Sequence, residues 1–308
     1  MHKVIQPEVF MIHVFGHRNP DSDSICSALV LADWLNGQGR PATPWRLGEL
    51  RTETRFILEC AGRESPALLT QPLDGLDVWL VDFSDFEQGP ESLARANIVG
   101  LVDHHRLGSL RTEAPFDAWI RAVGCSATIV LSLLDELTRP QARLLLGAIM
   151  SDTLCLTSPT TTPLDEAACQ RLAPLAELSL AEFGQQLLAA KTDLSGLSAA
   201  QLLRQDEKGY QVAGVNLVMS QIEVSSLAQI TPMMAELERE MAQRVHTDDL
   251  DAYVLMVTDL GEGASRICAC PHPKRSLPQL PKQAITLPGM VSRKKQGLPW
   301  LTAQLSQG

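Results

Sequence analysis

The sequence predicts an α/β protein with a parallel sheet in its N-terminal domain and a smaller α/β domain after it. Two observations predict this fold class. Short apolar runs alternate with stretches of helical periodicity, which is the pattern of strand–helix–strand units. The pattern of residue types then changes at residues 191–198, KTDLSGLS, where turn-forming residues interrupt a long helical pattern.

Three apolar runs in the first domain are interpreted as buried strands, at residues 11–15, 78–81 and 98–102. The first run ends at Gly16 and leads through a polar turn into a helical pattern at residues 25–35. Each of the other two is followed directly by an aspartate. Further helices are predicted at residues 127–137, 141–150 and 164–190. The first domain is therefore expected to span residues 1–191.

A linker is predicted at residues 192–199 and the second domain at residues 200–308. Residues 210–219 alternate in polarity around Gly214, as a hairpin does. Residues 230–245 predict a helix and residues 253–257 a strand. Residues 271–281 are rich in proline and predict a loop.

The composition narrows the classes of function. The chain has 308 residues, of which 45% are hydrophobic and 20% charged, as in a globular protein. Its formal net charge of −10 repels a phosphate backbone, so no nucleic-acid partner is expected, although metal ions can invert the field for a small anion. No apolar run reaches the roughly 18–20 residues that span a bilayer, so no membrane partner is expected. Seven scattered cysteines and a start without a signal-peptide pattern predict a cytoplasmic protein.

The densest chemical signal is residues 16–25, GHRNPDSDSI, where a strand passes into a helix. His17, Asp21 and Asp23 lie within seven residues of one another, and such a cluster would be self-repulsive without a cation. Imidazole and carboxylate ligands together suit Mn, Zn, Fe or Co. An aspartate helix cap beside a surface histidine explains the same residues equally well. The motif alone therefore leaves both interpretations open.

Three further segments carry similar residues. The segment VDHHR, residues 102–106, places His104 and His105 after a strand, where one could bind metal while the other faces a substrate. A solvated strand end is the alternative. Asp82 ends an apolar strand and Asp152 follows an apolar helix, where a capping role is the default. Together the four segments supply enough ligands for a dinuclear site with one shared carboxylate.

A basic cluster lies near the end of the chain, at residues 293–295, RKK. A solvated basic tail is the usual explanation for such a run. Arginine can also bind a phosphate through two parallel hydrogen bonds, and lysine as a point charge. In an acidic protein, this cluster could face an acidic metal site and bind the phosphates of a substrate.

These motifs resemble those of the family II, manganese-dependent inorganic pyrophosphatases of the DHH phosphoesterase superfamily. The family's first motif is similar to residues 16–28, GHRNPDSDSICSA, and the signature that names the superfamily is similar to VDHHR. Its later segments resemble VGCSATIV at residues 123–130 and GAIMSDTLCLTSPT at residues 147–160. Its closing motif resembles PGMVSRKKQ at residues 288–296. The resemblance implies a DHH domain, a DHHA2-type domain and an active site in the cleft between them.

The resemblance also implies two Mn²⁺ ions, with Co²⁺ as an alternative, and additional Mg²⁺ that arrives with the substrate. Asp82 would bridge the two ions, and the remaining metal ligands would be His17, Asp21, Asp23, His104 and Asp152. The other catalytic and phosphate-binding residues would be His105, Lys208, Arg293 and Lys294, with Gln88 as a polar residue near the site. One departure concerns Phe83-Ser84-Asp85, where the family usually carries His-Asn-Glu after the bridging aspartate. The hydrogen bonds beside Asp82 must therefore differ.

The reaction that the resemblance implies is hydrolysis of inorganic pyrophosphate to two phosphates, with a bridging hydroxide as the nucleophile. The partner is then a small-molecule substrate, and a homodimer through the N-terminal domain is expected. The nearest alternative is an exopolyphosphatase or another hydrolase of small phosphoanhydrides or phosphodiesters in the same superfamily. The nucleases and cyclic-dinucleotide phosphodiesterases usually carry a GGGH-type motif, which this sequence lacks. A regulatory metal or nucleotide sensor would need lost ligands or an added sensor domain, and neither is visible.

Overall fold

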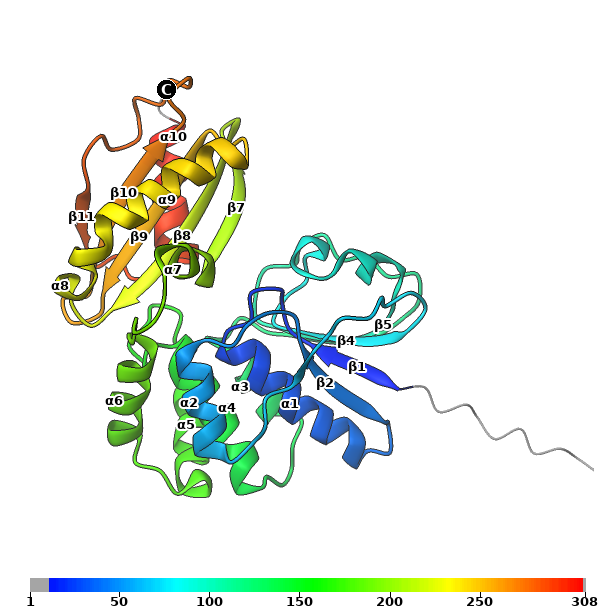
Figure 1. Ribbon diagram of the computed structural model, residues 1–308. Helices are drawn as coiled ribbons and strands as arrows, with labels where there is room; N and C mark the ends of the chain where they lie inside the picture. The colour runs from blue at the N-terminus through cyan, green and yellow to red at the C-terminus, as the bar shows by residue number, and fades with distance from the viewer. Residues whose placement is uncertain (1–10, 307–308) are drawn as a thin grey trace, which may run out of the picture. The chain divides into compact units, whose positions relative to one another are not determined.

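The computed structural model describes residues 11–306, and the chain forms two compact units that divide between Leu188 and Ala189 (Figure 1). The first unit contains a six-stranded sheet in which every neighbouring pair is parallel, as the sequence predicts. Its strands are β1 (Ile12–Phe15), β2 (Ala42–Arg46), β3 (Ala67–Leu68), β4 (Asp77–Val81), β5 (Asn97–Asp103) and β6 (Asp117–Ile120). They are arranged in the order β3-β2-β1-β4-β5-β6.

The central strands are apolar on both faces because both faces of the sheet are covered. Successive side chains alternate between two hydrophobic clusters. Val14 and Val81 pack in the larger cluster together with the helices of this unit. Phe15 and Leu80 pack on the opposite face, where Phe83 joins the second cluster. This double covering explains why these three strands are readable as apolar runs.

The helices of the first unit are α1 (Ser22–Gly37), α2 (Thr52–Ala61), α3 (Ser126–Leu131), α4 (Arg139–Asp152) and α5 (Pro163–Ala176), and α6 (Leu180–Lys191) begins in this unit and ends just past the boundary. Short 3₁₀ turns, η1 (Phe86–Gln88) and η2 (Glu91–Arg95), lie between β4 and β5. Two helix predictions are wrong in extent. The helix expected at residues 127–137 ends at Leu131, and Thr138 then caps a new helix through a reciprocal hydrogen-bonded pair with Gln141. The helix expected at residues 164–190 is two helices, because Glu177 adopts the left-handed conformation that ends α5.

The second unit contains a five-stranded sheet in the order β11-β10-β9-β8-β7. Its strands are β7 (Glu207–Val212), β8 (Val215–Val224), β9 (Ala252–Asp259), β10 (Ala264–Pro271) and β11 (Ile285–Pro288). Only β8 and β9 run parallel within this sheet, and the other pairs are antiparallel. The predicted hairpin is confirmed as β7 and β8, whose turn places both Ala213 and Gly214 at positive φ.

The helices of the second unit cover both faces of this sheet. They are α7 (Ala199–Gln205), α8 (Leu227–Ile230), η3 (Thr231–Met233), α9 (Met234–Thr247), the π-helical turn η4 (Arg293–Gly297) and α10 (Leu298–Leu305). On β9, Leu255 packs with α7 and α9, while Met256 packs on the other face with α10. The predicted helix and strand correspond to α9 and β9. Within residues 11–306, no helix combines the length and the apolar character needed to cross a bilayer.

Candidate metal centre

The polar residues singled out in the first unit lie at the carboxyl edge of its sheet. His17 follows β1, Asp82 follows β4, and His104 and His105 follow β5. These three strands are neighbours in the sheet, and the strand order reverses between β1 and β4. Such a reversal leaves a crevice at the carboxyl ends of the strands, where ligands bind in open α/β sheets.

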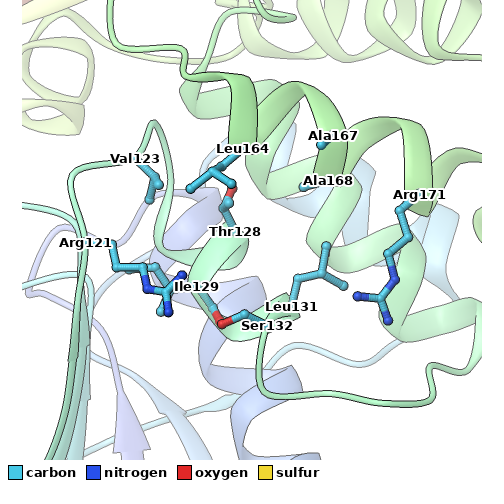
Figure 2. Close-up of a pocket in the computed structure, with 10 residues that line it drawn as sticks. All are labelled: Arg121, Val123, Thr128, Ile129, Leu131, Ser132, Leu164, Ala167, Ala168 and Arg171. Carbon is cyan, nitrogen blue, oxygen red and sulfur yellow. The ribbon is translucent and has the colours of Figure 1, made fainter.

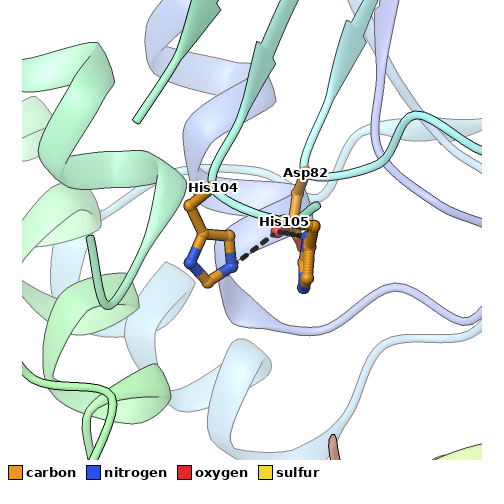
Figure 3. A group of neighbouring side chains, drawn as sticks. All are labelled: Asp82, His104 and His105. Atoms are coloured by element: carbon orange, nitrogen blue, oxygen red, sulfur yellow. Dashed lines mark ion pairs between the residues drawn. The ribbon is translucent and has the colours of Figure 1, made fainter. Parts of the chain in front are cut away.

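Asp82 is the residue to which most of the other side chains point. Its side chain is 1% exposed, and its two oxygens face different partners. Oδ2 lies 3.3 Å from Nε2 of His17, while Oδ1 lies 3.3 Å from Nε2 of His104 and 3.6 Å from Nδ1 of His105 (Figure 3). Burial alone would raise the pKa of Asp82, but the hydrogen bonds from His104 and His17 hold it well below its usual range.

The backbone conformation of Asp82 helps to orient its carboxylate between the histidines. Its φ of 68° lies in the left-handed region, which aspartate tolerates better than most residues. Its N–H donates to the carbonyl of Val102 at 2.8 Å, which fixes the turn against β5. Two hydroxyls support the carboxylate, because Ser24 Oγ donates to Oδ2 at 3.0 Å and Ser126 Oγ to Oδ1 at 3.3 Å.

The turn between β1 and α1 brings His17 and Asp21 to the same side of Asp82. Oδ1 of Asp21 accepts from the N–H of Ser24 and so caps α1, while Oδ2 lies 3.4 Å from Nε2 of His17. The cap interpretation is therefore confirmed, but the surface-histidine interpretation is wrong, since the His17 side chain is only 12% exposed. Burial lowers the pKa of His17, yet Asp21 and Asp82 together raise it to about 9.

A second group of potential metal ligands lies around Asp23, which is fully buried. Its carboxylate accepts from the N–H groups of Ser126 and Ala127, at 2.5 and 2.9 Å, at the start of α3. His104 links this group to Asp82, because its Nε2 also lies 3.7 Å from Asp152 Oδ2. Nδ1 of the same ring is 3.0 Å from the carbonyl of Val123, which fixes the ring orientation.

The carboxylates of this region are buried close to one another, and their pKa values are shifted accordingly. Burial, reinforced by Asp82, raises the pKa of Asp23 to about 7. Burial together with Asp21 and Asp23 raises the pKa of Asp152 well above its usual value. Asp82 overcomes the effect of burial on His104 and raises its pKa to about 10. Bound metal would replace the protons that hold these like charges together.

The donor atoms form three groups, each with one ligand atom from every member within 4.8 Å of the others. The groups are His17–Asp21–Asp82, Asp82–His104–His105 and Asp23–Cys125–Asp152. Imidazole nitrogen and carboxylate oxygen suit manganese, so the residues present fit that ion. All six ligands expected from the sequence thus lie in one region of the first unit.

The rings of His104 and His105 both lie beside Asp82, with their centroids 4.2 Å apart. Asp103, which is fully buried, binds Nδ1 of His105 at 2.9 Å and its backbone N–H at 3.0 Å. This carboxylate therefore orients His105. The sequence identifies Asp103 only as the aspartate directly after the strand predicted at residues 98–102 and gives it no role, although its place before the two histidines is a signal for one.

Phe83, Ser84 and Asp85, which depart from the family pattern, contact a hydrophobic cluster and a neighbouring loop. The ring of Phe83 packs 6.4 Å from that of Phe15 in the second hydrophobic cluster. Ser84 and Asp85 accept hydrogen bonds from the N–H groups of residues 108–110, in the loop after the two histidines. Gln88, the polar residue expected near the site, donates from its side-chain amide to Asp85 at 2.9 Å. Its backbone carbonyl accepts a hydrogen bond from the N–H of Arg18.

The cationic residues expected to bind phosphate all lie in the second unit. Lys208 is on β7, and Arg293 and Lys294 begin η4. Arg293 is 4% exposed, and its guanidinium group donates to both oxygens of Asp206 and to the hydroxyl of Tyr210. Its backbone N–H donates to Gln221. These supporting residues depend on contacts distant in sequence, so periodicity and spacing give no signal for them.

A cavity of about 210 Å³ lies elsewhere in the first unit, between α3 and α5 (Figure 2). Ile129, Leu131 and Ala168 form part of its apolar wall, and Arg121 and Arg171 lie at its edge. No carboxylate or histidine lines it, so its chemistry does not suit a metal ion. The metal centre is therefore the site that the geometry supports.

Comparison with known proteins agrees with this geometry. The family model for the N-terminal domain of the DHH family matches residues 11–155, and the model for the DHHA2 domain matches residues 185–304. A Staphylococcus haemolyticus protein named "Probable manganese-dependent inorganic pyrophosphatase" is 36% identical over 95% of this chain and 98% of its own length. A Staphylococcus carnosus protein of the same name is 34% identical over 96% and 99%. The chain belongs to the family of manganese-dependent inorganic pyrophosphatases.

Solved structures extend this family assignment to the fold. The structure titled "Methanococcus jannaschii putative family II inorganic pyrophosphatase" matches with a TM-score of 0.85 and 30% identity, over 96% of this chain and all of that one. An exopolyphosphatase-related protein from Bacteroides fragilis matches with a TM-score of 0.52 and 12% identity, over 97% and 92%. At that identity the second match shows a shared fold alone. The resemblance stated from the motifs is thus confirmed at the level of the family.

Proposed function

We propose that this protein hydrolyses inorganic pyrophosphate to two phosphates with two manganese ions, which share the carboxylate of Asp82. The observation that carries the proposal is the arrangement of histidines around that carboxylate. His17 faces one oxygen of Asp82 and His104 faces the other, each at 3.3 Å. A carboxylate with an imidazole on each side has the donor arrangement that two adjacent ions need. The names of the curated relatives support manganese as the metal.

The ligands are assigned to the two ions by their position around Asp82. His17 and Asp21 would hold the first ion together with Asp82. Asp23, His104 and Asp152 would complete the second. Co²⁺ is an alternative to Mn²⁺ for the same donors, and additional Mg²⁺ would arrive with the substrate. When bound, the ions would lower the pKa of a water shared between them and neutralise charge that develops on the phosphoryl oxygens.

The remaining residues bind and orient the substrate in this proposal. Asp103 holds Nδ1 of His105, so we assign the Nε2 atom of that ring to a phosphate oxygen. Asp206 fixes one side of the Arg293 guanidinium group, whose planar fork suits phosphate oxygens. Lys294 and Lys208 would add positive charge, and Gln88 would act indirectly through its hydrogen bond to Asp85.

The experiment compares metal-free protein reconstituted separately with Mn²⁺, Co²⁺ and Mg²⁺, with phosphate release measured from pyrophosphate, tripolyphosphate and a nucleotide. We expect pyrophosphate with Mn²⁺ to give the highest kcat/KM. Asp152→Asn should abolish that activity, whereas Asp74→Asn, which removes an exposed carboxylate paired with Arg95, should not. A strong preference for tripolyphosphate would replace this proposal with an exopolyphosphatase.

We also propose that two copies of the chain associate through β6. This strand is at an edge of the first sheet and all four of its residues are exposed, including Trp119 and Ile120 at 38% each. An open edge with large apolar side chains is a template for pairing with another strand. Trp119→Lys should give a monomer in sedimentation, while Leu68→Lys on the opposite edge strand, β3, should leave a dimer. A dimer that survives Trp119→Lys would refute the interface.

A further inference from the structure

The thiol of Cys125 lies beside two of the carboxylates assigned to metal. Its Sγ and one oxygen each of Asp23 and Asp152 are all within 4.8 Å of one another. Cys125 is fully buried and comes directly before α3. The next two residues, Ser126 and Ala127, donate their backbone N–H groups to Asp23. One segment therefore both holds the carboxylate and carries the thiol, which fixes the spacing between them.

The three donors differ in the ions that they prefer. Carboxylate oxygen suits Mn²⁺ and Mg²⁺, whereas a thiolate selects softer ions such as Zn²⁺. Affinity of a mixed site also rises from Mn²⁺ through Co²⁺ in the divalent series. Oxygen and nitrogen donors are the ligands that Mn²⁺ prefers, so a thiol contributes little to the affinity for this ion. With a softer ion, a sulfur atom at this distance is an additional ligand within reach.

We propose that Cys125 is a metal-ligating residue for soft divalent ions and so sets the selectivity of the Asp23–Asp152 half of the centre. The inference rests on the proposed function for the presence of a metal at these carboxylates. As the sulfur–metal bond forms, the thiol gives its proton to the solvent, so each ion bound in this way releases one additional proton. A purely structural cysteine would fill space in the core and would leave metal affinity unchanged.

Cys26 provides a matched control for this proposal. It is also fully buried, and it lies on α1 one turn after Asp23. Its thiol nevertheless belongs to none of the donor groups found among residues 11–306. Replacing Cys26 by serine changes the same atom at a similar depth without removing a proposed ligand.

The test uses full-length, metal-free protein titrated with Co²⁺, because a cobalt–thiolate bond gives a charge-transfer absorption band in the near ultraviolet. Wild type and Cys26→Ser should develop the band, and Cys125→Ser should not. The ratio of Zn²⁺ to Mn²⁺ affinity, measured by competition with a chelator, should fall roughly 10–100-fold in Cys125→Ser. Cys125→Ala, which buries no new hydroxyl, should behave in the same way and covers the case that the serine variant fails to fold.

Two results would overturn the inference. One is a cobalt–thiolate band that persists in both Cys125 variants, and the other is the absence of that band from wild type. Failure of the proposed function is measured separately, as a lack of pyrophosphate hydrolysis by wild-type protein with Mn²⁺. The spectrum can therefore fail while hydrolysis succeeds, and the reverse outcome is equally distinguishable.

Discussion

Replacing Asp82 by asparagine tests the centre with the least disturbance to the fold. Asparagine matches the shape of aspartate and tolerates the left-handed backbone that φ = 68° requires. It removes the negative charge that, together with burial, raises the pKa of Asp23 and of Asp152. It also removes the charge that His17 and His104 pair with, and the lowered pKa of Asp82 means that the fold stabilises the ionised carboxylate. We therefore expect the metal-free variant to be less stable than wild type at neutral pH.

Alanine at the same position loses the same charge and should lower stability further. A non-glycine residue without a polar side chain costs about 1–2 kcal/mol in the left-handed region. Loss of the bonds from Ser24 and Ser126 adds about 1 kcal/mol each. The total of about 3–4 kcal/mol should place the Tm of metal-free Asp82→Ala roughly 6–16 °C below that of Asp82→Asn, at about 2–4 °C per kcal/mol.

The assay is thermal unfolding of both variants with a chelator and with Mn²⁺, together with hydrolysis of pyrophosphate. Stabilisation by bound metal follows its affinity, so a 100-fold weaker site would lose about 2.7 kcal/mol of Mn²⁺-induced stabilisation. We expect Asp82→Asn to lose most of that stabilisation and at least about 10²-fold in kcat/KM, which corresponds to about 2.7 kcal/mol. A variant that keeps both the Mn²⁺-induced shift and the rate would refute the shared-carboxylate centre.

Three further predictions follow from single contacts. Asp103→Ala should lower kcat roughly 10–100-fold through misorientation of His105, with Mn²⁺ affinity little changed in a metal titration, and Asp103→Asn should recover part of the rate. Arg293→Lys loses the two hydrogen bonds from the buried guanidinium group to the partly exposed carboxylate of Asp206, so we expect a higher KM for pyrophosphate and about 1.5–3 kcal/mol lower unfolding free energy in urea. Gly16→Ala would place a Cβ atom 2.4 Å from the Cβ atom of Ser24. This overlap should lower the unfolding free energy by about 1–3 kcal/mol and weaken Mn²⁺ binding, and calorimetry measures both effects.

The strands that were predictable are those buried on both faces. β1, β4 and β5 consist largely of apolar residues and are readable as runs. β2 contains Pro44 and is only partly buried, while β6 is exposed along its whole length. Neither has the apolar run or the alternation that identifies a strand, and only pairing with a neighbour defines them.

The residues assigned to metal are recognisable in the sequence because they follow strands or lie at the end of a helix, but the contacts that support them are not. The hydroxyl of Ser24 reaches Asp82 across 58 residues of sequence, and that of Ser126 across 44. The amides that hold Asp23 are about a hundred residues away from it. Such contacts exist only after the chain has folded, so spacing within a motif cannot reveal them.

The departure from the family pattern after Asp82 changes contacts with the loop that follows the two histidines. Phe83 points into the hydrophobic cluster on one face of the sheet and contributes no polar atom to the metal ligands. Ser84 and Asp85 instead hold residues 108–110, in the loop that directly follows His104 and His105. A change in this segment is therefore transmitted first to the loop after His105, which is assigned to the phosphate, while Asp82 keeps its bonds to His17 and His104. The unusual segment should thus alter how substrate is held more than which metal is bound.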